Sequence, residues 1–375
     1  MSKATFDRSR NTHVMNHVLV VVGTRPELVK MAPVVRALED HEELSFELVH
    51  TGQHYDEELS DTFIETLGLP EPSRYLGVGS ASHSRQTADA LAAIGETIAE
   101  TDPEAVLAQG DTNTVLAAAL AASKSSAKFG HVEAGIRSFD RSMPEEVNRV
   151  LADHVVDWAF APTEAAADNL ASEGIEDDET VFVTGNTVVD ACRRYSAVAE
   201  QESTVLDEFD LTPGEYVVAT IHRQRNTDET DRLGEIMEAL DGADAPVVLP
   251  AHPRLRNALE ASDVRPEGSL RLIDPLGYLD FLRLQSAARL VVTDSGGIQE
   301  EAAVLEVPCL TVRPNTERPE TVEAGVNELV APADLAERLA AVYESEADSM
   351  VGEPDLYGDG DAGERVAEIL ATDLS

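Results

Sequence analysis

Residues 290–319 carry the pattern that points most clearly to chemistry. They read LVVTDSGGIQEEAAVLEVPCLTVRPNTERP, which predicts an apolar strand at 290–293 and a turn at 294–297. A helix from Ile298 and a second apolar strand ending at Arg313 are expected to follow. Adjacent glycines at such a turn let the backbone approach a ligand, and the free N–H groups of the first helical turn receive anions. The segment is interpreted as half of a mononucleotide-binding βαβ unit.

Two charged residues extend this interpretation beyond the phosphate. Glu301 lies one helical turn after Gly297, so its carboxylate can share a face with the phosphate site and reach a ribose diol. Arg318 follows the second strand, where the strand ends of open α/β sheets converge on the ligand crevice. A Ser-Gly-Gly tripeptide alone is more often only a tight turn. The order of strand, glycines, acid, strand and arginine favours nucleotide binding.

Polar residues also follow the predicted strands of the first half of the chain. Asp111 and Glu133 come after the apolar strands AVLAQ and KFGHV, and this position favours a functional role. Glu145 and Glu146 begin a predicted helix, where acids are ordinarily favoured, so surface exposure explains them equally well. The other polar residues at such strand ends are Arg25, Lys30, Gln53, His54, His131 and Arg137.

In the second half, His222 and Arg223 end the strand that begins at Tyr216, and His252 follows PVVLP. A histidine facing acids across a cleft can protonate or neutralise a leaving phosphate. The ten histidines show no spacing typical of metal ligands, so no metal site is predicted.

Apolar strands alternate with helices of about 10 to 18 residues, which predicts parallel, doubly wound sheets. The fold class is α/β, with two Rossmann-like domains facing each other across an interdomain cleft. No G-x-G-x-x-G follows the first strand of either half, which argues against a dinucleotide cofactor. The expected parts are a disordered leader at 1–16, domains at 17–195 and 215–353, a linker region at 196–214, and a terminal helical segment at 354–375.

Composition limits the class of protein. The chain has 375 residues, enough for two domains, and a formal net charge of −43. Such a charge excludes nucleic acid or an anionic membrane as the main partner, and it indicates a proteome adapted to high salt, which screens self-repulsion. No apolar run approaches a membrane span, and residues 1–16 lack a signal-peptide core. Cys192 and Cys309 are interpreted as reduced core residues of a cytoplasmic protein.

Nine motifs occur in an order and spacing that resembles the non-hydrolysing UDP-N-acetylglucosamine 2-epimerases. The resemblance covers residues 18–370 and implies a GT-B fold whose C-terminal helix crosses back to the first domain. It also implies a homodimer and a reaction without an external cofactor. The motifs are GTRPELVKMAPVV, TGQH, QGDTNT, HVEAGIRS, MPEEVNR, GNTVVD, HR, DSGGIQEEA and TERPE.

The reaction implied by the resemblance interconverts UDP-GlcNAc and UDP-ManNAc. The C2 proton is barely acidic, so UDP is expected to leave C1 as a base takes that proton, giving a 2-acetamidoglucal. Re-addition with proton delivery to the other face inverts C2, and the cleft must retain both fragments. The first domain is then the sugar side and the second binds UDP.

The resemblance also assigns roles to residues. The acid, base and leaving-group candidates are Asp111, Glu133, Glu145 and His222, and which carboxylate is the base stays open. Two opposed acids whose pKa values are pushed apart would suit proton removal from one face and delivery to the other. The expected substrate-binding residues are Arg25, Lys30, Phe281 beside the uracil, Ser295, Gly296, Gly297, Glu301 at the ribose and Arg318.

Several positions depart from the family pattern. A motif that often reads His-Arg-Arg-Glu-Asn in relatives here has Arg225 in place of the acid. Gln53-His54 and residues 85–87 match parts of a regulatory site for a second substrate molecule, but Asp56 stands where a neutral residue is usual. This argues against activation by substrate. Leu276-Gly277 likewise replaces a more polar pair near the uracil.

Four other functions remain open from the sequence. Within the fold, these are a hydrolysing epimerase that releases free ManNAc and an epimerase for a UDP-diacetamido-uronate. A GT-B glycosyltransferase would need an acceptor groove, often apolar, and no exposed apolar stretch of that kind is evident. A nucleotide-sugar sensor without turnover would retain the cleft but not exchange the C2 proton.

Overall fold

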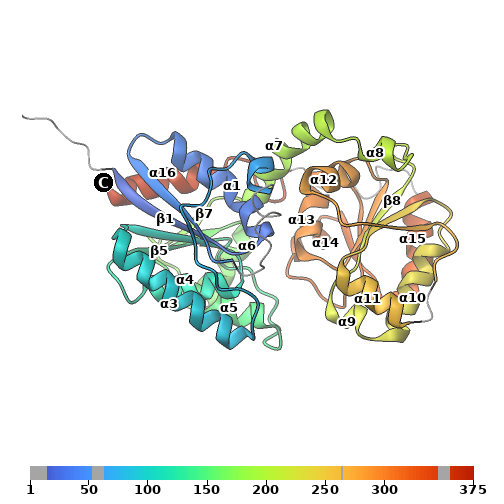
Figure 1. Cartoon of the computed structure of the whole chain (residues 1–375), viewed down its shortest axis with the longest axis horizontal. Helices are drawn as coiled ribbons and strands as arrows, with labels where there is room; N and C mark the ends of the chain where they lie inside the picture. Colours follow the sequence, from blue (N-terminus) through green and yellow to red (C-terminus); the bar gives the residue numbers. More distant parts are fainter. Residues whose placement is uncertain (1–14, 53–62, 263–264, 345–354) are drawn as a thin grey trace, which may run out of the picture.

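The computed structural model describes residues 15–52, 63–262, 265–344 and 355–375. Within these ranges the chain forms two lobes, each built around a parallel sheet with helices on both faces (Figure 1). The predicted α/β architecture of two doubly wound domains is confirmed. The expected leader falls almost entirely outside the described residues, and Asn16 already opens the first strand.

In the part of the chain that the structure describes, the first lobe has a seven-stranded sheet of order β3-β2-β1-β4-β5-β6-β7. The strand order reverses between β1 and β4, so the carboxyl ends of these two strands open onto a crevice where ligands bind in such folds. The central strands are apolar on both faces because helices cover both. The strands are β1 Asn16–Val22, β2 Leu44–His50, β3 Arg74–Tyr75, β4 Ala105–Gln109, β5 Lys128–Val132, β6 Trp158–Ala161 and β7 Val181–Val183.

The helices of the first lobe follow these strands in the expected alternation. Helix α1 starts with a capping box, in which Thr24 precedes the helix and Glu27 reaches back to it. Pro26 sits in the first turn, where its missing N–H costs nothing. The helices are α1 Arg25–Asp40, α3 His83–Thr101, α4 Asn113–Ala122, α5 Pro144–Asp153, α6 Glu164–Ser172 and α7 Thr187–Glu202.

The second lobe repeats the architecture with six strands among the described residues, in the order β10-β9-β8-β11-β12-β13. Its reversal lies between β8 and β11, where His222 and the Ser-Gly-Gly turn meet the open edge. The strands are β8 Val217–Thr220, β9 Val247–Pro250, β10 Leu270–Ile273, β11 Leu290–Thr293, β12 Cys309–Thr311 and β13 Asn327–Leu329. The helices are α9 Gln224–Thr227, α10 Thr230–Asp241, α11 Pro253–Ala261, α12 Tyr278–Ser286, α13 Gly296–Val304, α14 Pro319–Glu323, the 3-10 turn Pro332–Asp334 and α15 Leu335–Glu344.

Two predicted boundaries were wrong by two residues. Helix α13 begins at Gly296 rather than Ile298, with Ser295 as its N-cap. Both glycines therefore belong to the first helical turn and contribute its free N–H groups. The following strand ends at Thr311, because Arg313 already turns toward a carboxylate on the loop before α14.

Helices connect the two lobes (Figure 1). Helix α7 contacts α1 in the first lobe and both α12 and α13 in the second, and the short helix α8 Val205–Glu208 follows it. The acidic segment 196–214 thus contains the last turns of α7 and all of α8. Helix α16 Ala362–Leu374 ends the chain on the first lobe beside α1. There Trp158 donates a hydrogen bond of 2.7 Å from Nε1 to Asp373.

Both cysteines are buried and carry free thiols, Cys192 on α7 and Cys309 on β12. None of the helices in the described ranges has the length and apolar composition that crossing a bilayer demands.

Candidate functional site

Four charged side chains meet where the two lobes touch. We call Lys30, Glu133, Glu300 and Arg318 the interlobe cluster. The Lys30 ammonium lies 2.8 Å from Glu133 Oε1 and 2.8 Å from Glu300 Oε2. Arg318 donates from Nε to Glu300 over 2.8 Å and from its terminal nitrogen to Glu133 over 2.9 Å. Cations and carboxylates therefore alternate around a closed ring, and all four side chains are buried.

Each lobe contributes one cation and one carboxylate to this cluster. Lys30 lies on α1 and Glu133 directly after β5, whereas Glu300 lies on α13 and Arg318 caps α14. Glu133 follows β5 of the first sheet, and α13 follows β11 of the second. The sequence predicted a site at these carboxyl ends of the strands. Of the expected residues, the structure brings Lys30, Glu133 and Arg318 into direct contact.

The backbone at Glu133 is unusual, with φ of 72° in the left-handed region that non-glycine residues rarely adopt. Such a conformation costs of order 1 kcal/mol and persists where the surroundings over-determine it. Here the backbone N–H groups of Glu133 and Ala134 both donate to the Phe160 carbonyl over 3.1 Å. Gln109, from the end of β4, donates to the Glu133 carboxylate. These contacts hold the strained backbone of Glu133 and place its carboxylate at the lobe boundary.

The cluster pushes the pKa values of its two carboxylates apart. Burial raises the pKa of Glu133, and the nearby Lys30 and Arg318 only partly offset this. Burial acts the same way on Glu300, but Arg318 and Lys30 hold its pKa below the ordinary value. Glu300 therefore keeps the negative charge, while Glu133 can accept and return a proton at a higher pH than an ordinary glutamate. That is the behaviour expected of a general acid or base.

Asp111 stands just outside the cluster, at the end of β4. Its carboxylate pairs with Arg149 of α5, and its side chain is 34% exposed. A Cβ built on the preceding Gly110 would lie 3.9 Å from Glu133 Oε2, which places this loop against the cluster. Asp111 is thus close to Glu133 but remains open to solvent.

The two neighbouring glutamates of α5 have different surroundings. Glu146 is buried and accepts from the backbone N–H groups of Ser138 and Phe139 over 2.9 and 2.8 Å, and from Arg149 over 3.0 Å. Surface exposure was therefore the wrong explanation for Glu146. Glu145 is exposed at the start of the helix and makes none of the hydrogen bonds that hold the cluster together. Of these two glutamates, only Glu145 is open to solvent.

His222 is oriented by a buried aspartate. Its Nδ1 lies 2.7 Å from Asp294 Oδ1, and half of the His222 side chain is exposed. Asp294 also accepts from the backbone N–H of Arg223 and from Asn226 over 3.0 Å each. Burial alone would raise the pKa of Asp294, but these hydrogen bonds hold it below the ordinary value. A carboxylate-oriented histidine at a strand end suits proton transfer to a leaving group.

The same neighbourhood explains one departure from the family motif. Asn226 binds Asp294 and donates to the Val312 carbonyl over 3.1 Å, so the motif residue Asn keeps its structural contacts. Arg225 is exposed. The hydrogen bonds that orient His222 come from Asp294, and Arg225 takes no part in them.

The predicted nucleotide residues gather at the start of α13 and around it. A Cβ on Gly296 would lie 3.6 Å from the Arg318 guanidinium carbon, whereas Gly297 faces open space. Glu301 accepts from Gln285 over 2.8 Å, and burial raises its pKa to about 7. The first turn of α13 therefore lies next to Arg318, and free N–H groups beside a guanidinium are an arrangement that suits an anion.

Two further predicted residues lie apart from the cluster. Phe281 of α12 is partly buried and packs against an apolar core of the second lobe. Arg25 is exposed at the start of α1, with its guanidinium 5.8 Å from the centre of the Phe63 ring. Neither contacts the cluster. Their roles at uracil and phosphate stay predictions.

Sequence reasoning missed three residues of the site, which are Glu27, Gln109 and Glu300. It also missed that Asp294 is the hydrogen-bond partner of His222. Glu27 accepts from the N–H groups of Gly23 and Thr24 over 2.7 Å each and from the Thr112 hydroxyl over 2.5 Å. It thereby ties the loop before α1 to the loop that carries Asp111. Burial raises its pKa to about 7, although these hydrogen bonds act in the opposite direction. The T-x-x-E spacing of a capping box was the available signal.

The predicted regulatory residues divide into two groups. Gln53, His54 and Asp56 lie outside the described residues. Arg85 is exposed, whereas Gln86 is buried and donates to the Gly79 carbonyl over 3.0 Å. In the described ranges no three His, Cys, Asp or Glu side chains are grouped to hold a metal ion, and the absence of a metal site stays a prediction.

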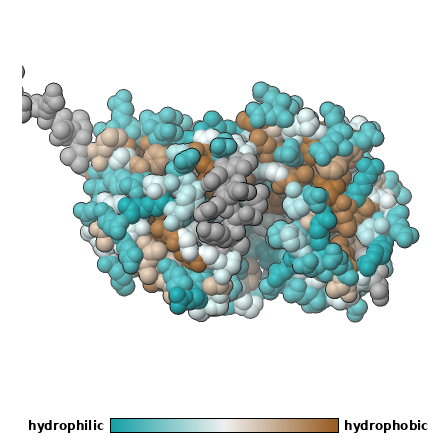
Figure 2. Space-filling model, viewed as in Figure 1, coloured by the Kyte–Doolittle hydropathy of each residue, from teal (hydrophilic) through white to brown (hydrophobic). Residues whose placement is uncertain are grey.

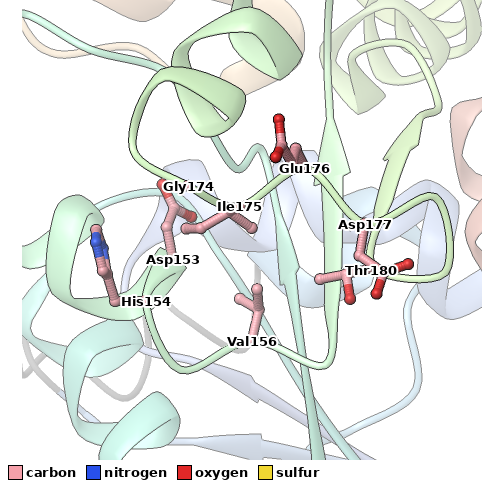
Figure 3. Close-up of a pocket in the computed structure, with 8 residues that line it drawn as sticks. All are labelled: Asp153, His154, Val156, Gly174, Ile175, Glu176, Asp177 and Thr180. Atoms are coloured by element: carbon pink, nitrogen blue, oxygen red, sulfur yellow. The ribbon is translucent and has the colours of Figure 1, made fainter.

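The molecular surface is hollowed where the lobes meet (Figure 2). A separate pocket lies on the first lobe, and none of the cluster residues lines it (Figure 3). Its lining includes His154 and Thr180 but no lysine or arginine. This pocket therefore contains none of the candidate catalytic or substrate-binding residues.

The family profile, the relatives and the solved structure described next are all 2-epimerases of UDP-sugars. The family profile described as UDP-N-acetylglucosamine 2-epimerase matches residues 36–371. A UDP-N-acetylglucosamine 2-epimerase of Methanocaldococcus jannaschii is 43% identical, over 94% of this chain and 98% of that protein. The UDP-2,3-diacetamido-2,3-dideoxy-D-glucuronate 2-epimerase of Pseudomonas aeruginosa is 40% identical, over 94% and 99%. The crystal structure of the M. jannaschii UDP-GlcNAc 2-epimerase with UDP-GlcNAc and UDP has a TM-score of 0.86 at 41% identity, covering 95% of this chain and 99% of that one.

We predict that Lys30→Met destabilises the protein strongly, because two buried carboxylates then share one cation. Removing one partner of a buried ion pair costs about 3–5 kcal/mol, and urea denaturation should show a fall of that size in the free energy of unfolding. The control is Arg85→Ala, which breaks an exposed pair with Asp89 and should cost less than about 1 kcal/mol. Equal losses in both variants would contradict the importance of the cluster.

Proposed function

The chain belongs to the UDP-N-acetylglucosamine 2-epimerase family, and from that membership we propose that it interconverts UDP-GlcNAc and UDP-ManNAc without net hydrolysis. The observation that carries the proposal is the interlobe cluster. It sets a carboxylate of raised pKa, Glu133, against Arg318 beside the anion-receiving turn of α13. A nucleotide sugar anchored on the second lobe then presents its hexose to acids of the first.

The proposed chemistry balances without an oxidant or a reductant. A base takes the C2 proton, the C2–H electron pair forms the C1=C2 bond, and the C1–O bond breaks to release UDP. The other product is a 2-acetamidoglucal. In the second half, an acid delivers a proton to the opposite face of C2, and a phosphate oxygen of UDP re-forms the bond to C1. No external cofactor is needed.

Substrate binding requires the cluster to open. Lys30 and Glu133 form one pair within the first lobe, and Arg318 and Glu300 form another within the second. Separation of the lobes therefore leaves no buried charge alone. We infer that Arg318 and the N–H groups of α13 turn toward the diphosphate, while Glu133 becomes free to face the sugar. Developing negative charge on UDP is then stabilised by groups already in place.

The proposal gives the remaining candidates separate tasks. Asp111 and Glu145, which are both accessible at the sugar side, are the partners for Glu133 in proton transfer on the two faces of C2. His222, held by Asp294 over 2.7 Å, serves the leaving phosphate. Lys30, which pairs with Glu133 and Glu300, offsets the negative charge of these carboxylates. The homodimer also stays a prediction.

A second substrate is favoured by one specific observation. The P. aeruginosa relative, 40% identical over nearly its whole length, acts on a UDP-2,3-diacetamido-glucuronate by its name. The elimination chemistry would be the same, since the two sugars differ at C3 and C6 and share the substituents of C1 and C2. Direct competition between the two nucleotide sugars in one reaction mixture separates these substrates by their ratio of kcat/KM.

The direct test is NMR of the purified protein with UDP-GlcNAc in deuterated, high-salt buffer. We expect UDP-ManNAc to appear and deuterium to enter C2 of both sugars. Release of free ManNAc and UDP as the main products would identify a hydrolysing enzyme instead. A chain that binds UDP-GlcNAc but leaves its C2 proton in place would be a sensor.

Two substitutions should separate proton transfer from nucleotide binding. Glu133→Gln is expected to slow C2 exchange roughly 10²- to 10⁴-fold, the usual contribution of a general acid or base, with UDP affinity retained. Glu301→Ala should instead weaken UDP binding, because the expected ribose contact is lost. Calorimetry with UDP and exchange by NMR measure the two effects. If both variants lost only stability, the assignment of the site would be wrong.

A further inference from the structure

His131 lies beneath the proposed site with both ring nitrogens engaged. It is the fourth residue of β5, and its side chain is fully buried. Nδ1 lies 2.5 Å from Asp153 Oδ1, and Nε2 lies 2.7 Å from the Gly110 carbonyl oxygen. A neutral imidazole has one donor and one acceptor nitrogen. A carbonyl oxygen and a carboxylate both accept, so each nitrogen needs a proton here.

The position of that second proton follows from Arg137. The other oxygen of Asp153 receives the Arg137 guanidinium over 2.7 Å and the Gly135 N–H over 3.1 Å. These donors stabilise an ionised carboxylate, so the shared proton belongs to the imidazole. Burial alone would lower the pKa of His131, but Asp153 opposes this and the pKa ends above the ordinary value.

The charges around the ring balance. Asp153 comes from the end of α5, and Arg137 follows β5 and also binds Glu173, which caps α6, over 2.8 Å. Glu133, two residues further along the chain from His131, adds negative potential. The His131 imidazolium and the Arg137 guanidinium therefore face the carboxylates of Asp153 and Glu173. Glu133 lies beside this group. Burial favours loss of the imidazole proton, but Asp153, the Gly110 carbonyl and Glu133 together outweigh it.

The ring connects the segments that bear the candidate acids. Through Nε2 it fixes Gly110, the residue before Asp111, in a backbone conformation with φ of 86°. Through its own strand it precedes Glu133. Through Asp153 it fixes the last residue of α5, the helix that begins next to Glu145. All three segments therefore converge on one buried side chain.

We propose that His131 is a permanently charged imidazolium and a positioning residue, which holds the loops of Asp111 and Glu133 and helix α5 in register for C2 proton transfer. The positioning role rests on the proposed function, whereas the charge state does not. His131 touches no substrate and transfers no proton itself. Its contribution is to the relative geometry of the acids, where a displacement of about 1 Å can cost roughly 10²-fold in rate.

The charge state is tested by NMR of protein labelled with ¹⁵N-histidine. Both ring nitrogens of His131, assigned by the signals lost in His131→Gln, should stay protonated from pH 6 to pH 8.5. The exposed His154 at the end of α5 is the comparison in the same spectra, because its side chain is open to solvent. A neutral His131 ring at pH 7 would overturn the inference, whether or not the protein is an epimerase.

The positioning role is tested by kinetics of His131→Gln. Its amide can still donate to Gly110 but cannot also reach Asp153. We expect kcat for epimerisation to fall roughly 10- to 100-fold. KM for UDP-GlcNAc and UDP affinity should stay unchanged, since the predicted nucleotide residues lie on the second lobe or, like Arg25, on α1. A merely structural role would lower the amount of folded, UDP-binding protein instead.

Ile94→Val is the matched control, because it removes one methylene from the first-lobe core and should lower stability without touching the acids. It is expected to keep kcat at temperatures where both variants are folded. Unchanged kcat in His131→Gln, or equal losses of kcat in the two variants, would exclude the positioning role. Failure of the wild-type protein to exchange C2 deuterium would instead count against the proposed function, and the NMR titration would still decide the charge state.

Discussion

Buried charge joins the two lobes of this protein. An isolated buried ion costs several kcal/mol, so each member of the interlobe cluster needs a partner whenever it is out of water. Each lobe brings one ion pair of its own, Lys30 with Glu133 and Arg318 with Glu300. Two further ion pairs between the lobes close the ring. The closed arrangement is fully satisfied, and an opened arrangement leaves no orphaned ion. Such a junction can be stable and still admit a charged ligand.

The same junction supplies the asymmetry that acid–base chemistry requires. Two glutamates share two cations, yet Glu300 is held ionised while burial raises the pKa of Glu133. Strained backbone at Glu133 and the buried His131–Asp153 pair below it fix the position of that carboxylate. Positioning and electrostatics therefore come from one set of buried contacts at the carboxyl ends of the first sheet.

Much of this was predictable from the sequence, and the exceptions have a physical cause. Apolar strands and turn glycines determine where the sheets end, so Lys30, Glu133 and Arg318 were found at the open edges. Glu300 was missed beside Glu301, because 71 acids offer little contrast and adjacent helical residues differ only in the face they occupy. Glu145 and Glu146 posed the same problem. Asp294 was expected only as a turn residue, since its partner His222 lies 72 positions away.

The central claim is that burial in the interlobe cluster raises the pKa of Glu133 and that the negative charge of Glu300 adds to this rise. The most direct measurement is the pH dependence of kcat/KM for C2 deuterium exchange in Glu300→Gln and in the wild-type protein. Because the negative charge of Glu300 raises the pKa of Glu133, its removal should lower that pKa. The base form of Glu133 would then appear at lower pH, and the acidic limb of the profile should move to lower pH. An acidic limb that stays in place or moves to higher pH would contradict the account.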